Sequence, residues 1–362
     1  MNILVVPDIG RSYNSVRPEA EVYIGLAKLG HNITIMTDLN SAYVKHYQDA
    51  GMEVIHLPMD KKFSLNYIKK IRQQINTKNI DIVYATKSRT IPNAAFACIG
   101  TKAKMIAYRG TTGGLHRSDL SNYITTLHPR IDGVICVAKG VEDSVKSKVK
   151  KSIHPFVQTI YKGHDFSWYQ EPATDLTTIN SDEKYFNVMC VGALRGHKGT
   201  KNVIDAMALL SDLNDLRLLL VGNNMEKEPF NSLTENSPAK NLIIRTGFRN
   251  DVPQLAKAAD FTLLPSTRKE GLPRTILESL SNGTPVITSN IEGSLEIITD
   301  GENGLVYPAE DIQALANTIR KVYENRELAT QLRKNAKKVI DDKFSHQQTI
   351  KNYEKYFLSL LS

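Results

Sequence analysis

Short apolar runs alternate with segments of helical character along almost the whole chain. Runs such as Ile3–Val6, Ile33–Thr37 and Phe186–Val191 have the length and composition of buried strands, and segments such as Pro18–Leu29 and 65–76 have helical spacing. Pro18 is expected in the first turn of its helix, where a missing N–H costs nothing. Strict alternation of this kind predicts βαβ units and parallel sheets. With 362 residues, the chain is long enough for two α/β domains.

The boundary between the two domains is predicted near residue 165. The turn Tyr161–Asp165 and the polar stretch Glu171–Lys184 have the composition of a linker. We therefore expect a first domain over 1–165 and a second over 166–345, with a last helix, 346–362, that crosses back to the first domain. Apolar side chains form a stripe on this last helix, at Ile350, Tyr353, Tyr356, Phe357 and Leu360.

Positive charge is concentrated in the first half of the chain. Residues 1–165 carry 23 Lys and Arg against 13 Asp and Glu, and the remainder carries 23 against 25. The basic clusters Lys61–Lys62, Lys69–Arg72 and Lys146–Lys151 would suit an anionic membrane surface or an acidic glycan, or would simply be solvated helix faces. They have no interleaved aromatic residues, so we expect no nucleic acid partner.

The chain shows neither a secretory signal at Met1–Val6 nor an apolar run of the roughly 20 residues that a membrane span needs. We expect a cytoplasmic protein, in contact at most with the inner face of the membrane. The cysteines, Cys98, Cys136 and Cys190, are odd in number and lie in apolar settings, which predicts reduced, buried thiols.

Two glutamates eight positions apart, Glu270 and Glu278, define the strongest candidate site. Glu270 is expected in the loop after the strand Phe261–Leu264, and Glu278 in the first turn of the next helix. In open parallel sheets, ligands bind at the carboxyl ends of the strands, where helix N-termini attract anions. A carboxylate beside an anion site can bind ligand hydroxyls. The alternative for Glu278 is a capping box with Thr275, which fits the same residues.

A basic glycine loop, Gly192–Gly199, follows the strand Phe186–Val191. It holds Arg195, His197 and Lys198, and it lacks the Walker spacing. Lysine and arginine in such a loop would bind phosphate, although exposed basic residues in a turn would look the same. His197 would be either a further phosphate donor or, as we favour, a solvent-facing residue.

At these residues the chain resembles the donor domain of retaining GT-B glycosyltransferases, in particular glycosyltransferase family 4. The matching features are Leu264-Pro265-Ser266, Glu270 and Glu278, together with the segment Asn250–Asp260 and the turn Tyr161–Asp165. The resemblance covers the whole chain and is densest over 186–310. It implies two Rossmann-like parallel-sheet domains that face a central cleft.

The resemblance also assigns roles. Lys198 and Arg195 would bind the diphosphate of a nucleotide-sugar, Glu278 the ribose, and Glu270 the transferred sugar. The remaining donor-site residues that it implies are Gly271 and Leu272 on the sugar, Arg274 and Thr275 on phosphate, Phe248 near the base, and Gly10 and Arg109 from the first domain. This chain departs from the family at Ala193, where the family has arginine, and at Arg109, where many relatives have a histidine; His116 would be a weaker substitute.

The function that follows is a retaining transferase that moves a sugar from a nucleotide-sugar to a saccharide or lipid-linked glycan in cell-surface polysaccharide or lipopolysaccharide synthesis. No Asp-x-Asp motif closes a strand, so we expect no cofactor and no obligatory metal. The first-domain cations Arg11 and Arg17 would suit an acidic acceptor or a lipid phosphate, or would be surface residues. A sugar-nucleotide 2-epimerase and a non-catalytic binding protein remain as alternatives.

Overall fold

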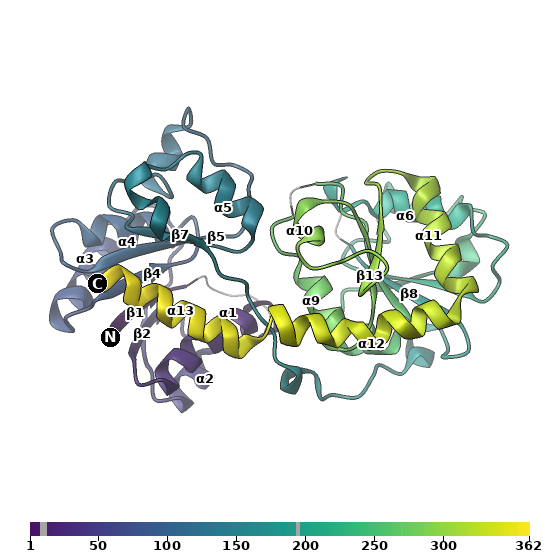
Figure 1. Cartoon of the computed structure of the whole chain (residues 1–362), viewed down its shortest axis with the longest axis horizontal. Helices are drawn as coiled ribbons and strands as arrows, with labels where there is room; N and C mark the ends of the chain where they lie inside the picture. The colour runs from purple at the N-terminus through teal and green to yellow at the C-terminus, as the bar shows by residue number, and fades with distance from the viewer. Residues whose placement is uncertain (8–12, 193–195, 269) are drawn as a thin grey trace. The chain divides into compact units, whose positions relative to one another are not determined.

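The computed structural model describes residues 1–7, 13–192, 196–268 and 270–362. The chain forms two compact units, the first made of residues 1–163 and 346–362 and the second of residues 164–345. Each unit is built around one parallel sheet, as the alternation of strands and helices predicts (Figure 1). The division lies two residues before the expected boundary after residue 165.

The first unit has a seven-stranded sheet in the order β3-β2-β1-β4-β5-β6-β7. Every neighbouring pair is parallel. The strands are β1 (Asn2–Val6), β2 (Asn32–Thr37), β3 (Glu53–His56), β4 (Ile82–Ala85), β5 (Lys104–Arg109), β6 (Gly133–Cys136) and β7 (Val157–Thr159). The helices are α1 (Tyr13–Lys28), α2 (Val44–Asp49), α3 (Leu65–Thr77), α4 (Thr90–Cys98), α5 (Lys139–Lys146) and α13 (His346–Leu361).

The first helix differs from the prediction, because α1 begins at Tyr13 and carries Pro18 in its interior. The expectation that Pro18 lies in the first turn is therefore wrong. The apolar spacing used to place the helix starts only after the proline, since the turn before it contains the polar residues Asn14 and Ser15. Helices interrupted by proline are an exception to the boundary rule.

The last helix, α13, returns to the first unit and packs beside α1 (Figure 1). Tyr353 and Phe357 are buried and make edge contacts with Tyr84 of β4, with ring centroids 5.9 Å apart in both pairs. Gly25 of α1 permits the close approach, because a Cβ atom there would lie 2.3 Å from Ile350 Cδ1. The predicted apolar stripe is therefore the packing face of α13.

The second unit has a six-stranded parallel sheet in the order β10-β9-β8-β11-β12-β13. Its first strand, β8, lies between β9 and β11. The strands that follow β8 are therefore placed toward one edge of the sheet as far as β10, and toward the other edge from β11 onward. The strands are β8 (Phe186–Val191), β9 (Leu216–Val221), β10 (Ile243–Gly247), β11 (Phe261–Leu264), β12 (Val286–Ser289) and β13 (Gly304–Tyr307). The helices are α6 (Thr200–Ala208), α7 (Phe230–Glu235), α8 (Val252–Ala258), α9 (Arg274–Ser281), α10 (Glu292–Leu295), α11 (Ile312–Glu324) and α12 (Arg326–Lys343).

The polar stretch 171–184 is not a free linker, which corrects the prediction. Leu176 and Ile179 are buried in the second unit and pack with Met189, Leu219 and Leu255. A polar composition conceals this packing because two apolar anchors are enough to hold a short segment on a core. The three cysteines are buried free thiols, as expected, and burial raises the pKa of each to about 12.

Among the described residues, none of the helices combines the length and apolar character that crossing a bilayer requires.

Candidate active site

The candidate site of the second unit forms where the loops after β8 and β11 leave neighbouring strands. In a parallel sheet whose strand order reverses between two adjacent strands, their outgoing loops diverge and open a crevice for ligands. The two loops touch at their bases: Gly199 has φ +68°, and a Cβ atom there would lie 1.9 Å from the carbonyl oxygen of Pro265. The N–H of Thr267 donates to the carbonyl of His197 over 2.8 Å. The loops are thus fixed to each other.

Lys198 and Glu270 meet across this pair of loops. The ammonium Nζ of Lys198 lies 2.5 Å from Oε1 of Glu270, and Ser266 Oγ donates to the same oxygen over 2.8 Å. The side chain of Lys198 is 27% exposed and that of Glu270 is 14% exposed, so both are accessible to a ligand. Ser266 is fully buried, and its carbonyl accepts a hydrogen bond from Ser289. The sequence-predicted cation and carboxylate therefore form one site.

The loop that carries Glu270 is also supported from the side of α10. A Cβ atom on Gly293 would lie 2.0 Å from the carbonyl oxygen of Gly271, so only glycine permits this contact. Our sequence reasoning missed Gly293. The only available signal was a glycine directly after Glu292, which is too common a pattern to be specific.

Glu278 points to Arg274 and does not cap its helix. Pro273 precedes α9, Thr275 lies inside it, and no side chain caps the first turn. Glu278 is the fifth residue of α9, so the expected first-turn position and the capping box with Thr275 are both wrong. The physical reason is that the helix begins at Arg274, two residues too early for Thr275 to act as a cap.

The carboxyl of Glu278 is 5% exposed and lies 3.0 Å from Nε of Arg274. Burial raises its pKa above the ordinary value, and the Arg274 guanidinium opposes this only in part. A buried carboxylate with one partner on its own helix retains lone pairs for further hydrogen bonds. Glu278 is therefore suited to accept hydrogen bonds from hydroxyl groups.

Thr200, the first residue of α6, is a second residue that sequence reasoning missed. Its hydroxyl is buried directly below Gly192, and within the described ranges it makes no hydrogen bond. Buried hydroxyls nearly always have a partner, so this one marks a position where a ligand or a water is expected. A threonine after glycine at a helix start resembles any other helix start, which is why it was not identified.

The other sequence-predicted residues are dispersed. Gly271 and Leu272 follow Glu270 directly, while Phe248 lies after β10 with 61% of its surface exposed. Arg109 ends β5 in the first unit, where its Nε donates to the carbonyl of Thr111 over 2.9 Å and its Nη2 to that of Gly113. Arg109 thus stabilises its own glycine loop. The predicted residues Arg195 and Gly10, and likewise Arg11, lie outside the described residues.

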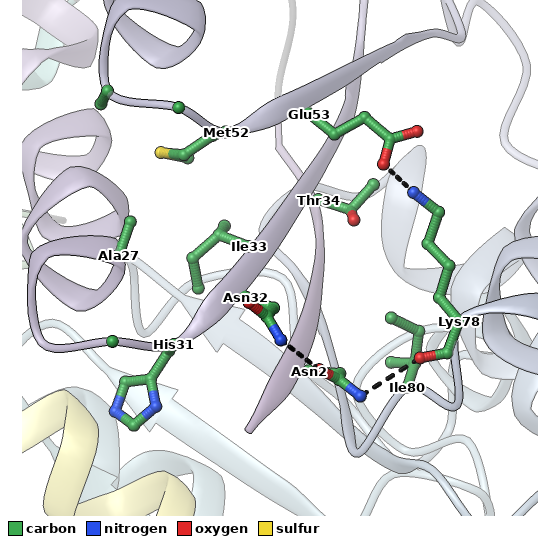
Figure 2. Close-up of a pocket in the computed structure, with 13 residues that line it drawn as sticks. Asn2, Ala27, His31, Asn32, Ile33, Thr34, Met52, Glu53, Lys78 and Ile80 are labelled. Carbon is green, nitrogen blue, oxygen red and sulfur yellow. Dashed lines mark hydrogen bonds and ion pairs between the residues drawn. The ribbon is translucent and has the colours of Figure 1, made fainter.

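A separate hollow of about 540 Å³ lies in the first unit, at the amino ends of β1, β2 and β3 (Figure 2). Its polar side chains bind one another: Lys78 pairs with Glu53, and Asn32 Nδ2 donates to Asn2 Oδ1 over 2.9 Å. Ligands of open α/β sheets bind at the opposite, carboxyl ends of the strands. This hollow is therefore not the candidate site. In the part of the chain that the structure describes, no group of three or more His, Cys, Asp or Glu is placed to hold a metal ion.

Comparison with known proteins agrees with this geometry. Residues 174–339, nearly the whole second unit, match the family "Glycosyl transferases group 1". The N-acetyl-alpha-D-glucosaminyl L-malate synthase of Bacillus anthracis is 24% identical over 354 residues, which cover 93% of this chain and 91% of that protein. The N,N'-diacetylbacillosaminyl-diphospho-undecaprenol alpha-1,3-N-acetylgalactosaminyltransferase of Campylobacter jejuni is 29% identical over 61% of this chain and 54% of that one.

The fold is that of GT-B glycosyltransferases. The crystal structure of Anabaena Alr3699/HepE in complex with UDP aligns over 99% of this chain and 100% of that chain, with a TM-score of 0.83 and 19% identity. The same protein in complex with UDP-glucose aligns with a TM-score of 0.82. Residues 174–339, which hold the paired glutamates and the basic loop, thus match the glycosyl transferases group 1, the family that these features predicted for this part of the chain.

Proposed function

We propose that this protein is a retaining glycosyltransferase that moves a sugar from a nucleotide-sugar to a saccharide or a lipid-linked glycan. The observation that carries the proposal is the meeting of Lys198 and Glu270 across the two loops at the reversal of strand order. The names of the relatives are consistent with it, since one transfers to a diphospho-undecaprenol-linked sugar and another is solved with UDP-glucose. Synthesis of cell-surface polysaccharide or lipopolysaccharide is the setting that such an acceptor implies.

Lys198 would bind the diphosphate of the donor. Without a ligand, its ammonium is paired with Glu270, so the positive charge of Lys198 and the negative charge of Glu270 compensate each other. When a diphosphate enters, the ammonium can contact both the phosphate oxygens and the carboxylate, because lysine has three donors. The negative charge that develops as the nucleotide leaves would then be stabilised by a cation already in position.

Glu270 would hold hydroxyl groups of the transferred sugar. Ser266 fixes one carboxylate oxygen, Oε1, at 2.8 Å, and the other oxygen remains for the ligand. The backbone of Gly271 and Leu272 adjoins this carboxylate and would contact the same sugar. The N–H groups of Arg274 and Thr275, in the unpaired first turn of α9, would face phosphate.

Glu278 would bind the two ribose hydroxyls. Its burial removes competing water, which strengthens hydrogen bonds from a ligand. The exposed ring of Phe248 would lie near the base.

The chemical step would proceed without a protein nucleophile. The bond from the anomeric carbon to the diphosphate oxygen breaks, the acceptor hydroxyl oxygen bonds to the same face of that carbon, and the hydroxyl proton passes to the departing diphosphate. Lys198 would take the charge-stabilising role that Mg²⁺ has in other transferases. We therefore expect EDTA to leave the activity unchanged; loss of activity that Mg²⁺ or Mn²⁺ restores would contradict this part of the proposal.

The first test is a thermal-shift screen with UDP-, GDP- and ADP-sugars, followed by a transfer assay with the sugar that binds. A donor at a hundred times its Kd should raise stability by about 2.7 kcal/mol, and Glu278→Ala should reduce this gain to about 0.3–1.4 kcal/mol. The products distinguish the alternatives: an epimerase would change UDP-N-acetylglucosamine in the absence of any acceptor. A protein that binds a donor yet neither hydrolyses nor transfers it would be a non-catalytic binding protein.

A further inference from the structure

The first unit presents four exposed apolar side chains on two loops of its surface. Phe63 and Leu65 stand at the start of α3, with 48% and 66% of their surface exposed. Leu120 and Tyr123 stand on the short 3-10 helix Leu120–Ile124 (η1), with 82% and 43% exposed. Exposed apolar residues are common when scattered, but a group of them on a surface usually marks a contact site.

The loop that carries Phe63 is held by the buried side chain of Asn93 of α4. Asn93 Oδ1 accepts from the N–H of Ser64 over 2.9 Å, and Nδ2 donates to the carbonyls of Lys61 and Lys62, both over 3.3 Å. Asn93 itself is fully buried. The exposure of Phe63 is therefore imposed by a fixed backbone.

The turn that carries Leu120 is held in the same way. Asp119 Oδ1 accepts from the N–H of Ser121 over 2.9 Å, and Nδ2 of Asn122 donates to the carbonyl of His116 over 3.0 Å. Asn122 is 5% exposed, so it anchors the turn from the inside. Leu120 is then left pointing into solvent.

A chain of ring contacts connects the two loops. Phe63 packs edge-on against Phe96 of α4, with centroids 5.2 Å apart, and Phe96 packs against His128 at 4.8 Å. His128 in turn lines a hollow of about 390 Å³ that is bordered by Tyr123. The charge of Lys62 also acts on Asp119 and contributes to lowering the pKa of its carboxyl, after hydrogen bonds from Ser121. The four apolar side chains thus belong to one surface region.

Basic side chains surround this region. Lys61 and Lys62 directly precede Phe63 and are exposed, and Arg117, Lys148 and Lys150 line the hollow beside Tyr123. Two of these cations also have partners within the protein: Arg117 Nε donates to the carbonyl of Lys148 over 2.8 Å, and Lys148 Nζ donates to Ser144 Oγ over 2.7 Å. These partners are neutral, so they leave the positive charges uncompensated, whereas Lys146 is neutralised by Glu142 at 2.7 Å.

We propose that this region, the apolar–basic patch of Phe63, Leu65, Leu120, Tyr123, Lys61, Lys62, Arg117, Lys148 and Lys150, docks on an anionic lipid bilayer. Apolar side chains held outward and ringed by cations match the two layers of such a surface, hydrocarbon below and phosphate above. A soluble acidic glycan would be bound by the cations alone and would leave the four apolar side chains in water. The inference deepens the proposed function, because a lipid-linked acceptor lies at the same surface.

The experiment is flotation of the full chain with vesicles, without any sugar nucleotide. Vesicles of phosphatidylcholine mixed with phosphatidylglycerol should bind the protein, binding should weaken as salt rises, and vesicles of phosphatidylcholine alone should bind it poorly. Phe63→Ser combined with Leu120→Ser should lower partitioning on the order of tenfold or more, since each loses an apolar side chain from the contact. Lys61→Glu with Lys62→Glu should lower it by at least about tenfold.

Matched controls are available in the second unit. Leu209 is 47% exposed, and Lys337 and Lys338 are adjacent exposed lysines on α12. Leu209→Ser, and Lys337→Glu with Lys338→Glu, should leave vesicle binding unchanged. Absence of vesicle binding, equal binding to neutral vesicles, or equal losses in the controls would each overturn the proposal.

Two further measurements separate the outcomes. The protein could bind an acidic polysaccharide and not bind vesicles, with the polysaccharide binding abolished in the Lys61 and Lys62 variants. That result would identify a glycan surface and would also overturn the proposal of bilayer docking. Donor-induced thermal shifts should be the same in patch variants and in the original chain. The docking surface and the transferase activity can therefore fail independently of each other.

Discussion

Replacing Glu278 by glutamine should move stability and donor binding in opposite directions. Glutamine has nearly the same shape and carries no charge. Burial raises the pKa of Glu278, so its ionised form is disfavoured in the folded protein, and each unit of such a rise is worth about 1.4 kcal/mol. The net rise already includes the attraction of Arg274, whose side chain is 46% exposed, so loss of this ion pair is not subtracted a second time.

The sign of the pH dependence follows from the direction of the shift. A carboxyl whose pKa is higher in the folded than in the unfolded protein makes its full contribution to the free energy of unfolding below its ordinary pKa of 4.5. That contribution to stability is lost as pH rises through the pKa of the folded state. Glu278→Gln should therefore equal the original chain in acid and become more stable than it at neutral pH. Each 1 kcal/mol of such a gain would raise the unfolding temperature by roughly 2–4 °C for a unit of this size.

Donor affinity should fall in the same variant. A hydrogen bond to a charged group is worth about 1.5–3 kcal/mol, so Kd for the nucleotide-sugar should rise roughly 10- to 150-fold. Thermal unfolding as a function of pH and calorimetric titration with the donor measure the two effects separately. The exposed Glu302→Gln is the matched control and should change neither quantity. A Glu278→Gln protein that is less stable at neutral pH and binds the donor normally would refute the reasoning.

Three further changes test the loops and the first unit. Lys198→Met should weaken donor binding roughly 10- to 150-fold, whereas Lys201→Met, which removes an exposed lysine paired with its own helix, should leave calorimetric Kd unchanged. Gly199→Ala would place a Cβ atom 1.9 Å from a backbone carbonyl oxygen at a φ of +68°. Urea denaturation should therefore show that the free energy of unfolding falls by at least about 1–2 kcal/mol. In the control Gly196→Ala, the added Cβ atom meets nothing within 4 Å, and the free energy of unfolding should change little. Burial alone would raise the pKa of Glu142, but hydrogen bonds from two lysines and from β7 lower it to about 2. The two lysines are 57% and 33% exposed, so solvent screens their attraction, and Glu142→Gln should cost about 1–2 kcal/mol at neutral pH. The difference should vanish in acid denaturation as pH falls from 4.5 to about 2.

The contrast between Lys198 and Glu278 shows where sequence reasoning succeeds. Lys198 was identified because a glycine-bearing loop after a strand has a recognisable local composition, and the structure places it beside Glu270. The capping-box alternative for Glu278 is wrong because it places the start of α9 two residues later than the structure does. Helix boundaries are the least certain part of any such prediction.

Gly293 and Thr200 could not have been found from the sequence. Each matters only through a neighbour that is distant along the chain or concealed in the fold: Gly293 through the carbonyl of Gly271, and Thr200 through the burial of its hydroxyl below Gly192. The apolar–basic patch is a similar case, since Phe63 and Leu120 belong to different loops that Asn93 and Asn122 fix separately.

The amino-acid sequence by itself determined the parallel α/β class, the positions of most strands and helices, the buried thiols and the two loops that carry the site. These are local properties, because periodicity and turn residues report which face of each element is buried. Only the tertiary structure decided which side chains meet. Lys198 and Glu270 are 72 residues apart and touch because β8 and β11 are neighbours in the sheet, and strand order is set by packing of the whole unit, which no local pattern encodes.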